Sequence, residues 1–489
     1  MKSHSRLFPN LSKLFILISI FLSFSGFSQQ AVTYTVYGDS SNVYEISGLE
    51  TQNGHLLTAI YDFLNGVDIV VVFRSDNGGM TWDSITTFGI DSAYHGYIDP
   101  YLTMDSVGTI SLIAMRGVLQ PGILYNGHNC WIQQSTDDGL TWNLHGFSPN
   151  IGSGSGTDFP RTSAWSVDQM LLTYQEIINS PPVIVACTSS DGGISWSNLI
   201  SFPSVNGHWI GGSSIKKGFG SKAYVTYSDL NDKQLYFSES YNNGITWSLM
   251  DTIGHYNSLG YFYLTSIITN QNISGYGVLS HAAHHFENLY YYQKNSGTWS
   301  KTLIDSISGY AEGFMDSSGI IYVAYCKIGN QMVYLNYCYS IDGGITFTPP
   351  FTADSIQASV PITMSMIGDY SAIYKTSDGK IHISWVANYG DKVRAKHTII
   401  SNPVSIKELP ISSDGINVSY HPSLQQILVK HPSSLQYSLI LMDISGKVIK
   451  KRTAESGNQV INTNGLTSGI YIVTIREGNV ETSAKVNIY

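Results

Sequence analysis

An eight-residue pattern that recurs five times constrains the fold of this chain more than any other feature. The copies begin at Ser75, Ser135, Ser189, Ser240 and Ser340, and they read SDNGGMTW, STDDGLTW, SSDGGISW, SYNNGITW and SIDGGITF. Most copies start roughly 50–60 residues after the previous one, which is typical of an array built from one supersecondary unit. The longer interval before the last copy holds a degenerate one, residues 294–299 (KNSGTW).

The chemistry of this pattern is that of a turn leading into a strand. Its third residue is Asp or Asn, whose side-chain oxygen accepts hydrogen bonds from backbone N–H groups further along, and its fifth is Gly, which tolerates a positive φ. The recurring carboxylate could also suggest a calcium loop, but the further oxygen donors and the closing Glu of such a loop are absent. We therefore assign a structural role to the third residues, which are Asn77, Asp137, Asp191, Asn242 and Asp342.

The segments around each copy follow one plan, with three strands before the turn and one after it. In the first unit these are residues 42–52, 55–63, 68–75 and 81–88, and the second strand of the plan recurs seven times. The seventh unit, residues 370–400, lacks a clear fourth strand, whereas residues 31–37 (AVTYTVY) form a strand without a neighbour. Pairing these two segments would complete the seventh unit and cover an exposed sheet edge.

The pattern S-x-[DN]-x-G-x-[TS]-W resembles the Asp-box, or bacterial neuraminidase repeat, of sialidases and related β-propellers. The resemblance covers roughly residues 31–400 and implies an all-β propeller with a box between the third and fourth strands of each blade. We expect seven blades from the repeat count, whereas the sialidase resemblance points to six and would make one unit an insertion. It does not by itself imply sialidase activity, because function depends on the site that a fold carries.

Composition and the N-terminal sequence indicate a secreted protein. Basic residues, an apolar run over residues 14–24 and small residues before Gln29 predict a signal peptide at residues 1–28, and no apolar stretch is long enough to span a membrane. A net charge of −9 disfavours nucleic acid and anionic membranes as partners. The four cysteines are too few for a disulfide framework, and Cys326, expected to face about residue 333, is not opposite Cys338. We expect no metal and no cofactor, since no CxxC or His-rich spacing is present.

The boxes end before a break at residues 401–410, and the tail follows a different pattern of strands. Residues 441–448 (LMDISGKV) and 465–475 (GLTSGIYIVTI) resemble the C-terminal sorting domain of type IX secretion in Bacteroidota, although the family's Pro-Asn-Pro is replaced by His421-Pro422-Ser423. The resemblance implies the type IX machinery as a partner and a location outside the cell or on its surface. The alternative is a small β-sandwich that binds carbohydrate or supports the propeller. We predict three segments: residues 1–28, the propeller at 29–403 and a β-sandwich at 404–489.

Polar residues gather where innermost strands begin and second strands end, and in a propeller both positions reach one face. Carboxylates and aromatic rings in such a place suit a sugar, although an Asp at a strand start often only caps a turn. We name as catalytic candidates Asp99, Asp158, Glu176 and Glu312, and as substrate-binding candidates Tyr97, Arg116, Arg161, His208, Trp209 and Asp369.

Sialidase chemistry requires an arginine triad, and the sequence departs from it. The family's first Arg lies in a Y/F-R-I-P motif before a G-x-L-L strand, whereas this chain reads YEIS at 44–47 and GHLL at 54–57, with Glu45 in place of Arg. Arg74 precedes a box and is expected to be structural, which leaves Arg116 and Arg161 near the face.

We therefore expect a secreted, sialidase-like propeller that binds or processes extracellular glycans. The alternatives are a diverged exo-glycosidase of the sialidase type and a surface adhesin that binds protein without catalysis. Two facing carboxylates about 5–9.5 Å apart would indicate hydrolysis, whereas scattered ones would indicate binding.

Overall fold

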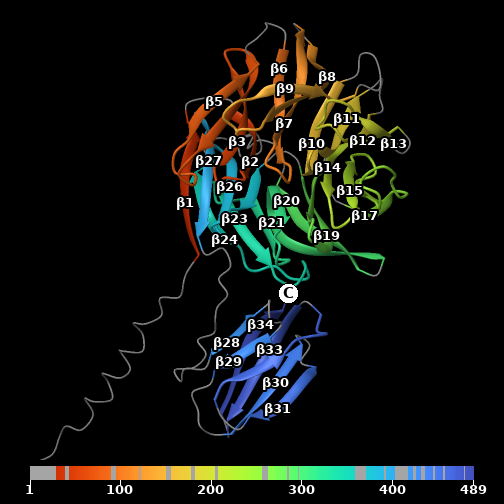
Figure 1. The fold of residues 1–489 in the computed structure, drawn as a ribbon. Helices are drawn as coiled ribbons and strands as arrows, with labels where there is room; N and C mark the ends of the chain where they lie inside the picture. Colours follow the sequence, from red (N-terminus) through yellow and green to blue (C-terminus); the bar gives the residue numbers. More distant parts are fainter. Residues whose placement is uncertain are drawn as a thin grey trace, which may run out of the picture. The chain divides into compact units, whose positions relative to one another are not determined.

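The computed structural model describes most of the chain as strands, with no helix among the described residues. One compact unit comprises Gln30–Pro403 and another contains the C-terminal segment Val404–Tyr489 (Figure 1). The predicted signal peptide lies outside the described residues. The structure describes residues 29–489 apart from 39–42, 90–94, 121–122, 150–155, 178–181, 204–206, 256–262, 283–285, 296, 358–370, 390–391, 402–416, 422–425, 431–435, 444–446, 455–456, 468, 478–479 and 489.

The larger compact unit is built from seven four-stranded antiparallel units, which we number in chain order. Units one to four each contain four consecutive strands, paired in sequence order. Unit one is β2 (Val43–Glu50), β3 (Leu56–Leu64), β4 (Val67–Ser75) and β5 (Asp83–Phe88); unit two is β6 (His95–Met104), β7 (Ile110–Gln120), β8 (Ile123–Ser135) and β9 (Asn143–Phe147). Unit three is β10 (Gly156–Ser166), β11 (Gln169–Ile177), β12 (Val183–Ser189) and β13 (Ser197–Pro203); unit four is β14 (Ile210–Lys217), β15 (Ala223–Asp229), β16 (Gln234–Ser240) and β17 (Asp251–His255).

Units five and six share one long strand. The first half of β21 (Thr298–Met315) pairs with β20 as the fourth strand of unit five, and its second half pairs with β22 as the first strand of unit six. Unit five also contains β18 (Tyr263–Asn270), β19 (Ile273–Ala282) and β20 (Glu287–Asn295); unit six continues with β22 (Ile321–Gly329), β23 (Met332–Ser340) and β24 (Phe351–Gln357).

Unit seven joins the two ends of the larger compact unit. It contains β25 (Ala372–Lys375), β26 (Ile381–Asn388) and β27 (Val393–Ser401), and its fourth strand is β1 (Gln30–Tyr37). The β1 strand pairs with β27 from Gln30 opposite Ser401 to Tyr37 opposite Ala395, which confirms the predicted use of the N-terminal strand. In Figure 1 red β1 lies beside blue β27.

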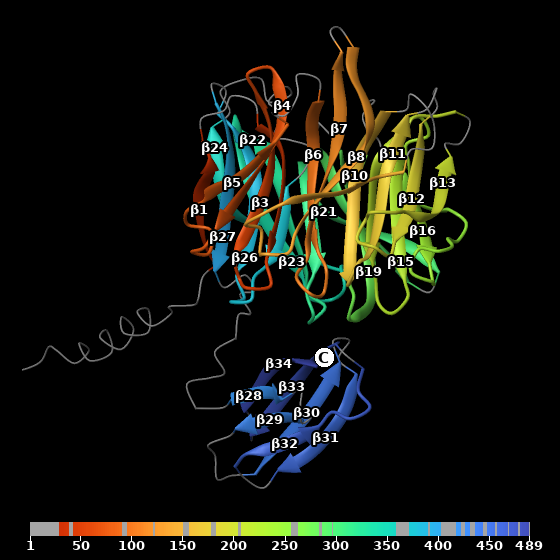
Figure 2. The same cartoon turned by 45° about the horizontal axis from the view of Figure 1, so that its top comes forward.

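The first strands of successive units contact one another from β2 to β25, and β25 also contacts β2. Figure 2 shows the sheets standing side by side, as expected for a β-propeller. Hydrogen bonds join unit seven to unit one, including those from Ser377 to the Glu50 carboxylate and from Thr58 Oγ1 to Ser384 Oγ. The repeat count of seven is therefore confirmed by the strand pairing.

Each box forms the predicted turn between a third and a fourth strand. In the second box, Asp137 Oδ1 accepts hydrogen bonds from the Thr141 N–H and the Ser135 hydroxyl, both at 2.8 Å, and Ser135 Oγ accepts from the Gly139 N–H at 2.9 Å. The same three bonds recur in the other four boxes. The boxes therefore form the hydrogen-bonded turns that their sequence predicts.

The box glycines also bring neighbouring units together. Gly139 has a φ of 85°, and a Cβ there would lie 2.6 Å from Leu57 in the preceding unit. A Cβ at Gly79, in the first box, would lie 2.6 Å from His397 of unit seven. Glycine is favoured at these positions, because the positive φ strains other residues and the close approach leaves little room for a side chain.

The C-terminal domain is a β-sandwich with a core of its own. One sheet contains β28 (Asn417–His421), β29 (Gln426–Lys430) and β32 (Gln459–Asn462); the other contains β30 (Tyr437–Asp443), β31 (Val448–Ala454), β33 (Gly469–Glu477) and β34 (Val480–Ile488). Ile427 and Ile461 from the first sheet share a buried cluster with Leu439 and Val473 from the second. The predicted β-sandwich is therefore confirmed.

All four cysteines are buried free thiols. The predicted register of one hairpin was wrong, because Cys326 faces Leu335 and not residue 333, and Cys338 faces Val323. Burial raises the pKa of the Cys130 and Cys326 thiols to about 12, which keeps them protonated. Among the described residues, no helix is long and apolar enough to cross a membrane.

Two buried histidines contact each other beside the junction of units seven and one. His382 Nδ1 and His397 Nε2 are 2.8 Å apart, and His397 Nδ1 is 3.0 Å from Ser384 Oγ. Burial lowers the pKa of His382 to about 4, with Asp378 opposing it and Lys380 acting in the same direction. Burial, together with the neighbouring His382, also holds the pKa of His397 well below its usual value. Both imidazoles are therefore neutral at pH 7.

We predict that the box hydrogen bonds stabilise the propeller measurably. Asp191 accepts bonds from Ser189 and Ser195, and these lower its pKa to about 2 although burial alone would raise it. Asp191→Ala should lower the free energy of unfolding by about 1–3 kcal/mol, because it removes bonds to a charged acceptor. Urea unfolding followed by tryptophan fluorescence measures this. Ser190→Ala, at an exposed neighbour in the same turn, is the control, and equal stability of the two variants would contradict the prediction.

We also predict that acid weakens the junction of units seven and one. A histidine whose pKa is lowered by folding contributes its full stabilisation at pH values above its unfolded-state pKa of about 6.5. This contribution is lost as the pH falls toward the folded-state pKa. Between pH 7 and pH 5, the titration of His382 alone should lower the free energy of unfolding by about 2 kcal/mol. Urea unfolding at both pH values should show a smaller loss for His382→Gln than for wild type. His255→Gln, at an exposed histidine, should keep the wild-type loss, and an equal loss in all three proteins would contradict the prediction.

Candidate functional site

The first strands of five units contain a matching irregularity in their pairing. One extra residue interrupts the register between Val43 and Ile46, Ile98 and Tyr101, Asp158 and Arg161, Gly211 and Ser214, and Gly309 and Glu312. Asp99, Phe159 and Tyr310 adopt a positive φ of 50–55° within these bulges, which is strained for residues other than glycine. A bulge changes the direction of the side chains that follow it, so Tyr101, Arg161, Ser214 and Glu312 occupy equivalent positions.

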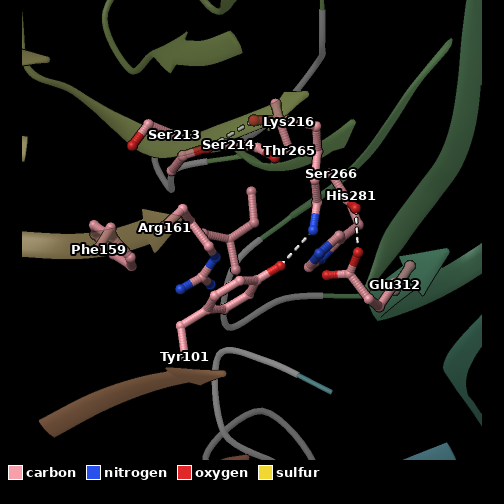
Figure 3. Close-up of a pocket in the computed structure, with 13 residues that line it drawn as sticks. Tyr101, Phe159, Arg161, Ser213, Ser214, Lys216, Thr265, Ser266, His281 and Glu312 are labelled. Atoms are coloured by element: carbon pink, nitrogen blue, oxygen red, sulfur yellow. Dashed lines mark hydrogen bonds between the residues drawn. The ribbon is translucent and has the colours of Figure 1, made fainter. Parts of the chain in front are cut away.

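Four polar side chains that lie in or after these bulged segments line the same cavity of about 200 Å³. They are Tyr101 from β6, Arg161 from β10, Lys216 from β14 and Glu312 from β21. A smaller adjoining pocket includes the same four residues and adds Ser213, Ser266 and His281 (Figure 3). We call Tyr101, Arg161, Lys216, Ser266 and Glu312 the channel site; its residues come from five consecutive units, two to six.

The positive side of the channel site is organised around one phenol. Lys216 Nζ donates a hydrogen bond of 2.6 Å to Tyr101 Oη and lies 5.2 Å from the centre of its ring. The Arg161 guanidinium carbon lies 4.8 Å from the same ring centre. Burial alone would lower the pKa of Lys216, but its attraction to the Tyr101 oxygen and the Glu312 carboxylate outweighs burial, and the net shift is upward. Both cations are thus charged at neutral pH.

The opposite side offers oxygen atoms. The Glu312 carboxylate accepts a hydrogen bond from the Ser266 hydroxyl and another, at 3.3 Å, from the Gly313 N–H. The Ser213 hydroxyl lines the same pocket and is buried with no hydrogen-bond partner among the described residues. The channel site therefore combines two cations, a carboxylate and hydroxyl groups in one enclosed space.

Of the four predicted catalytic carboxylates, the structure brings only Glu312 to the channel site. Asp99 is buried in the β6 bulge, and Asp158 Oδ1 accepts a hydrogen bond from the neighbouring Phe159 N–H at 2.9 Å. Glu176 is buried near the end of β11, opposite Thr157. None of these three carboxylates is among the described residues that line the channel cavity.

The predicted substrate-binding residues fall in three places. Arg161 lines the channel, whereas Tyr97 and Arg116 lie in an outer aromatic cavity with Phe88, Trp131 and Phe147. Arg116 lies there 5.6 Å from the centre of the Phe147 ring. His208 contacts Asp229 and Asp232, Trp209 is exposed, and Asp369 lies outside the described residues.

Sequence reasoning missed Tyr101, Lys216, Ser266 and His281 as site residues. One signal was available for Tyr101, because the sequences Asp99-Pro100-Tyr101 and Phe159-Pro160-Arg161 place Tyr101 and Arg161 at the same distance along the chain from the preceding box tryptophan. Nothing comparable marks Lys216. Arg74 is structural, as predicted, since it bonds Asp76 Oδ1 at 2.7 Å and the Asp138 carbonyl at 3.3 Å.

Comparison with solved structures shows the fold alone. A Dyadobacter fermentans protein of unknown function is 12% identical, with a TM-score of 0.50, and the match covers 77% of this chain and 100% of that one. A Penicillium chrysogenum alpha-L-arabinanase is 13% identical over 76% of this chain and 98% of its own, with a TM-score of 0.46. A Hadza microbial sialidase is 14% identical over 75% and 68%, with a TM-score of 0.47. None of the curated proteins matches this chain by sequence.

A family match identifies the C-terminal domain. Residues 413–489 match the secretion system C-terminal sorting domain, which confirms the predicted type IX tail and its relation to that machinery. The match spans the β-sandwich and not the propeller. The chain is therefore a β-propeller that carries a type IX sorting domain and is delivered outside the cell or to its surface.

Proposed function

We propose that the propeller binds an extracellular glycan that carries an acidic group, and that the channel site holds this group. The observation that carries the proposal is the placement of Arg161 and Lys216 against one ring, that of Tyr101. An enclosed guanidinium and ammonium together suit a carboxylate or sulfate, since hydrogen bonds between charged partners are the strongest of their kind.

The ring of Tyr101 has a specific role in this proposal. It lies within cation–π distance of both positive groups, and its hydroxyl accepts the Lys216 hydrogen bond. The ring therefore serves to hold two like charges close together before the ligand arrives. Glu312, with Ser266, is placed to accept hydrogen bonds from sugar hydroxyls on the other side of the pocket.

The single carboxylate among the described residues of the channel cavity favours binding over hydrolysis. Hydrolysis of a glycoside by the common mechanisms uses two carboxyl groups about 5–9.5 Å apart, and the described lining of the channel cavity contributes Glu312 alone. The sorting domain, which delivers the propeller outside the cell or to its surface, is consistent with an extracellular ligand.

A second candidate, a diverged exo-glycosidase, is favoured by one observation. Sialidases use a tyrosine as the nucleophile instead of a carboxylate, and Tyr101 Oη lies in the channel with Lys216 bonded to it and with Glu312 in the same pocket. In that reaction Tyr101 would give its proton to water and attack the anomeric carbon, while the glycosidic bond breaks and Glu312 supplies a proton to the leaving oxygen. Water would then hydrolyse the bond between Tyr101 and the sugar and restore both side chains.

We predict that Lys216→Met weakens binding of acidic oligosaccharides by about 10–100-fold, because it removes a charge-assisted contact worth about 1.5–3 kcal/mol. Glycan-array screening of the purified protein, followed by calorimetric titration, measures the affinity. Lys222→Met is the matched control, because Lys222 is bonded to Glu239 outside the channel and should not affect binding. Unchanged affinity in Lys216→Met, or equal affinity for neutral glycans, would contradict the proposal.

The same preparations separate the two candidates. Turnover of chromogenic glycosides that is abolished by Tyr101→Phe would establish the exo-glycosidase. Retention of acidic glycans without turnover would establish the binding protein.

A further inference from the structure

The strongest unassigned cluster lies in unit four, outside the channel site. His208 precedes β14, Asp229 ends β15, and Asp232 lies in the turn between β15 and β16. Their potential ligand atoms all lie within 4.8 Å of one another. We infer that His208, Asp229 and Asp232 bind a divalent transition-metal cation, of which Zn²⁺ and Mn²⁺ are the best candidates.

The distances between the donor atoms fit such an ion. His208 Nδ1 is 3.3 Å from Asp229 Oδ2 and 3.4 Å from Asp232 Oδ2. A zinc ion bonded tetrahedrally to nitrogen and oxygen at about 2.0–2.1 Å separates its ligands by about 3.3–3.4 Å. The two separations from His208 therefore match those of a zinc coordination shell, and the third, between the two carboxylates, is at most 4.8 Å.

An ordinary ion pair explains this geometry less well. His208 Nδ1 can make one hydrogen bond to Asp229 Oδ2 at 3.3 Å, but a single proton on Nδ1 can point at only one of the two oxygens that approach it. His55 provides the contrast, because its Nδ1 lies 2.9 Å from Asp76 and its other nitrogen lies 3.3 Å from Asp138. In that cluster each nitrogen has its own carboxylate, and the donors do not converge on one point.

Backbone hydrogen bonds fix the ligands in place. Asp229 is fully buried, and its Oδ1 accepts bonds of 2.9 Å from the Asn231 and Asp232 N–H groups, so that Oδ2 is directed at His208. The turn is tied to the His208 segment by two further bonds, from the Trp209 N–H to Asn231 Oδ1 at 3.0 Å and from the Leu230 N–H to the Trp209 carbonyl at 2.9 Å. Such outer contacts orient the ligands of metal sites.

The donor set selects the class of ion. Calcium and magnesium prefer shells made of oxygen, whereas an imidazole nitrogen with two carboxylates suits zinc, manganese or iron. Three protein ligands leave at least one position for water or a ligand oxygen. Asp232 is 38% exposed and the neighbouring Trp209 is 41% exposed, so solvent reaches the cluster. The expectation of no metal came from the spacing of Cys and His, which cannot reveal ligands brought together from two loops.

Binding of the ion alone tests the inference. The full-length protein, prepared without a polyhistidine tag and stripped with a chelator, is titrated with ZnCl₂ and with MnCl₂ in a calorimeter. We expect one high-affinity ion per chain and a rise in the unfolding temperature on addition of the ion. Asp232→Asn should weaken binding by at least about 100-fold, since even outer-shell changes cost 10–100-fold.

Two further variants control this experiment. His208→Gln should lose binding as Asp232→Asn does, whereas His55→Gln should retain wild-type affinity. Asp232 is exposed, so its variant should fold, and circular dichroism verifies this. Absence of binding up to millimolar ion, equal binding by wild type and Asp232→Asn, or a preference for Ca²⁺ would overturn the inference.

Discussion

The pairing of β1 with β27 is the constraint on which the rest of the propeller depends. It joins the first strand of the larger compact unit to its last described strand and completes unit seven, whose other three described strands are consecutive in the sequence. Without it, β27 would present an open edge of N–H and C=O groups. The first box strengthens the same junction, because Gly79 packs against His397 and the Trp82 ring lies 4.9 Å from that imidazole.

The channel site depends on this arrangement through the first strands of the units. Each of these strands touches the next, and the bulges at equivalent positions direct one side chain from each of several units inward. Tyr101, Arg161 and Glu312 belong to three different units that are separated widely in sequence. Their convergence is therefore a property of the whole propeller, because it depends on the packing of successive units.

Much of the fold could be predicted from the sequence, because the patterns that determine it lie within short segments of the chain. The box turn depends on hydrogen bonds within eight residues, the period of the boxes sets the number of units, and the free strand at residues 31–37 matches the incomplete seventh unit. The hairpin at Cys326 was placed two residues out of register, because strand alternation alone does not fix the exact turn.

The site was predicted only in part, and the bulges explain why. In a regular strand Tyr97 and Tyr101 would lie on the same face, since side chains alternate with a period of two. The extra residue in β6 places them on opposite faces, so Tyr101 reaches the channel and Tyr97 packs in the outer aromatic cavity with Trp131. Arg161 and Glu312 were predicted because the sequence alone placed these charged residues near the expected starts of innermost strands, whereas Lys216 lies near the end of β14 and gave no such signal.

A crystal structure of the protein with a bound acidic oligosaccharide would test the central claim most directly. The account predicts that the acidic group of the ligand lies within hydrogen-bond distance of both Arg161 and Lys216, with a sugar hydroxyl on Glu312. Density for the acidic group at the outer aromatic cavity, or at Trp209, with the channel site filled only by water, would contradict it.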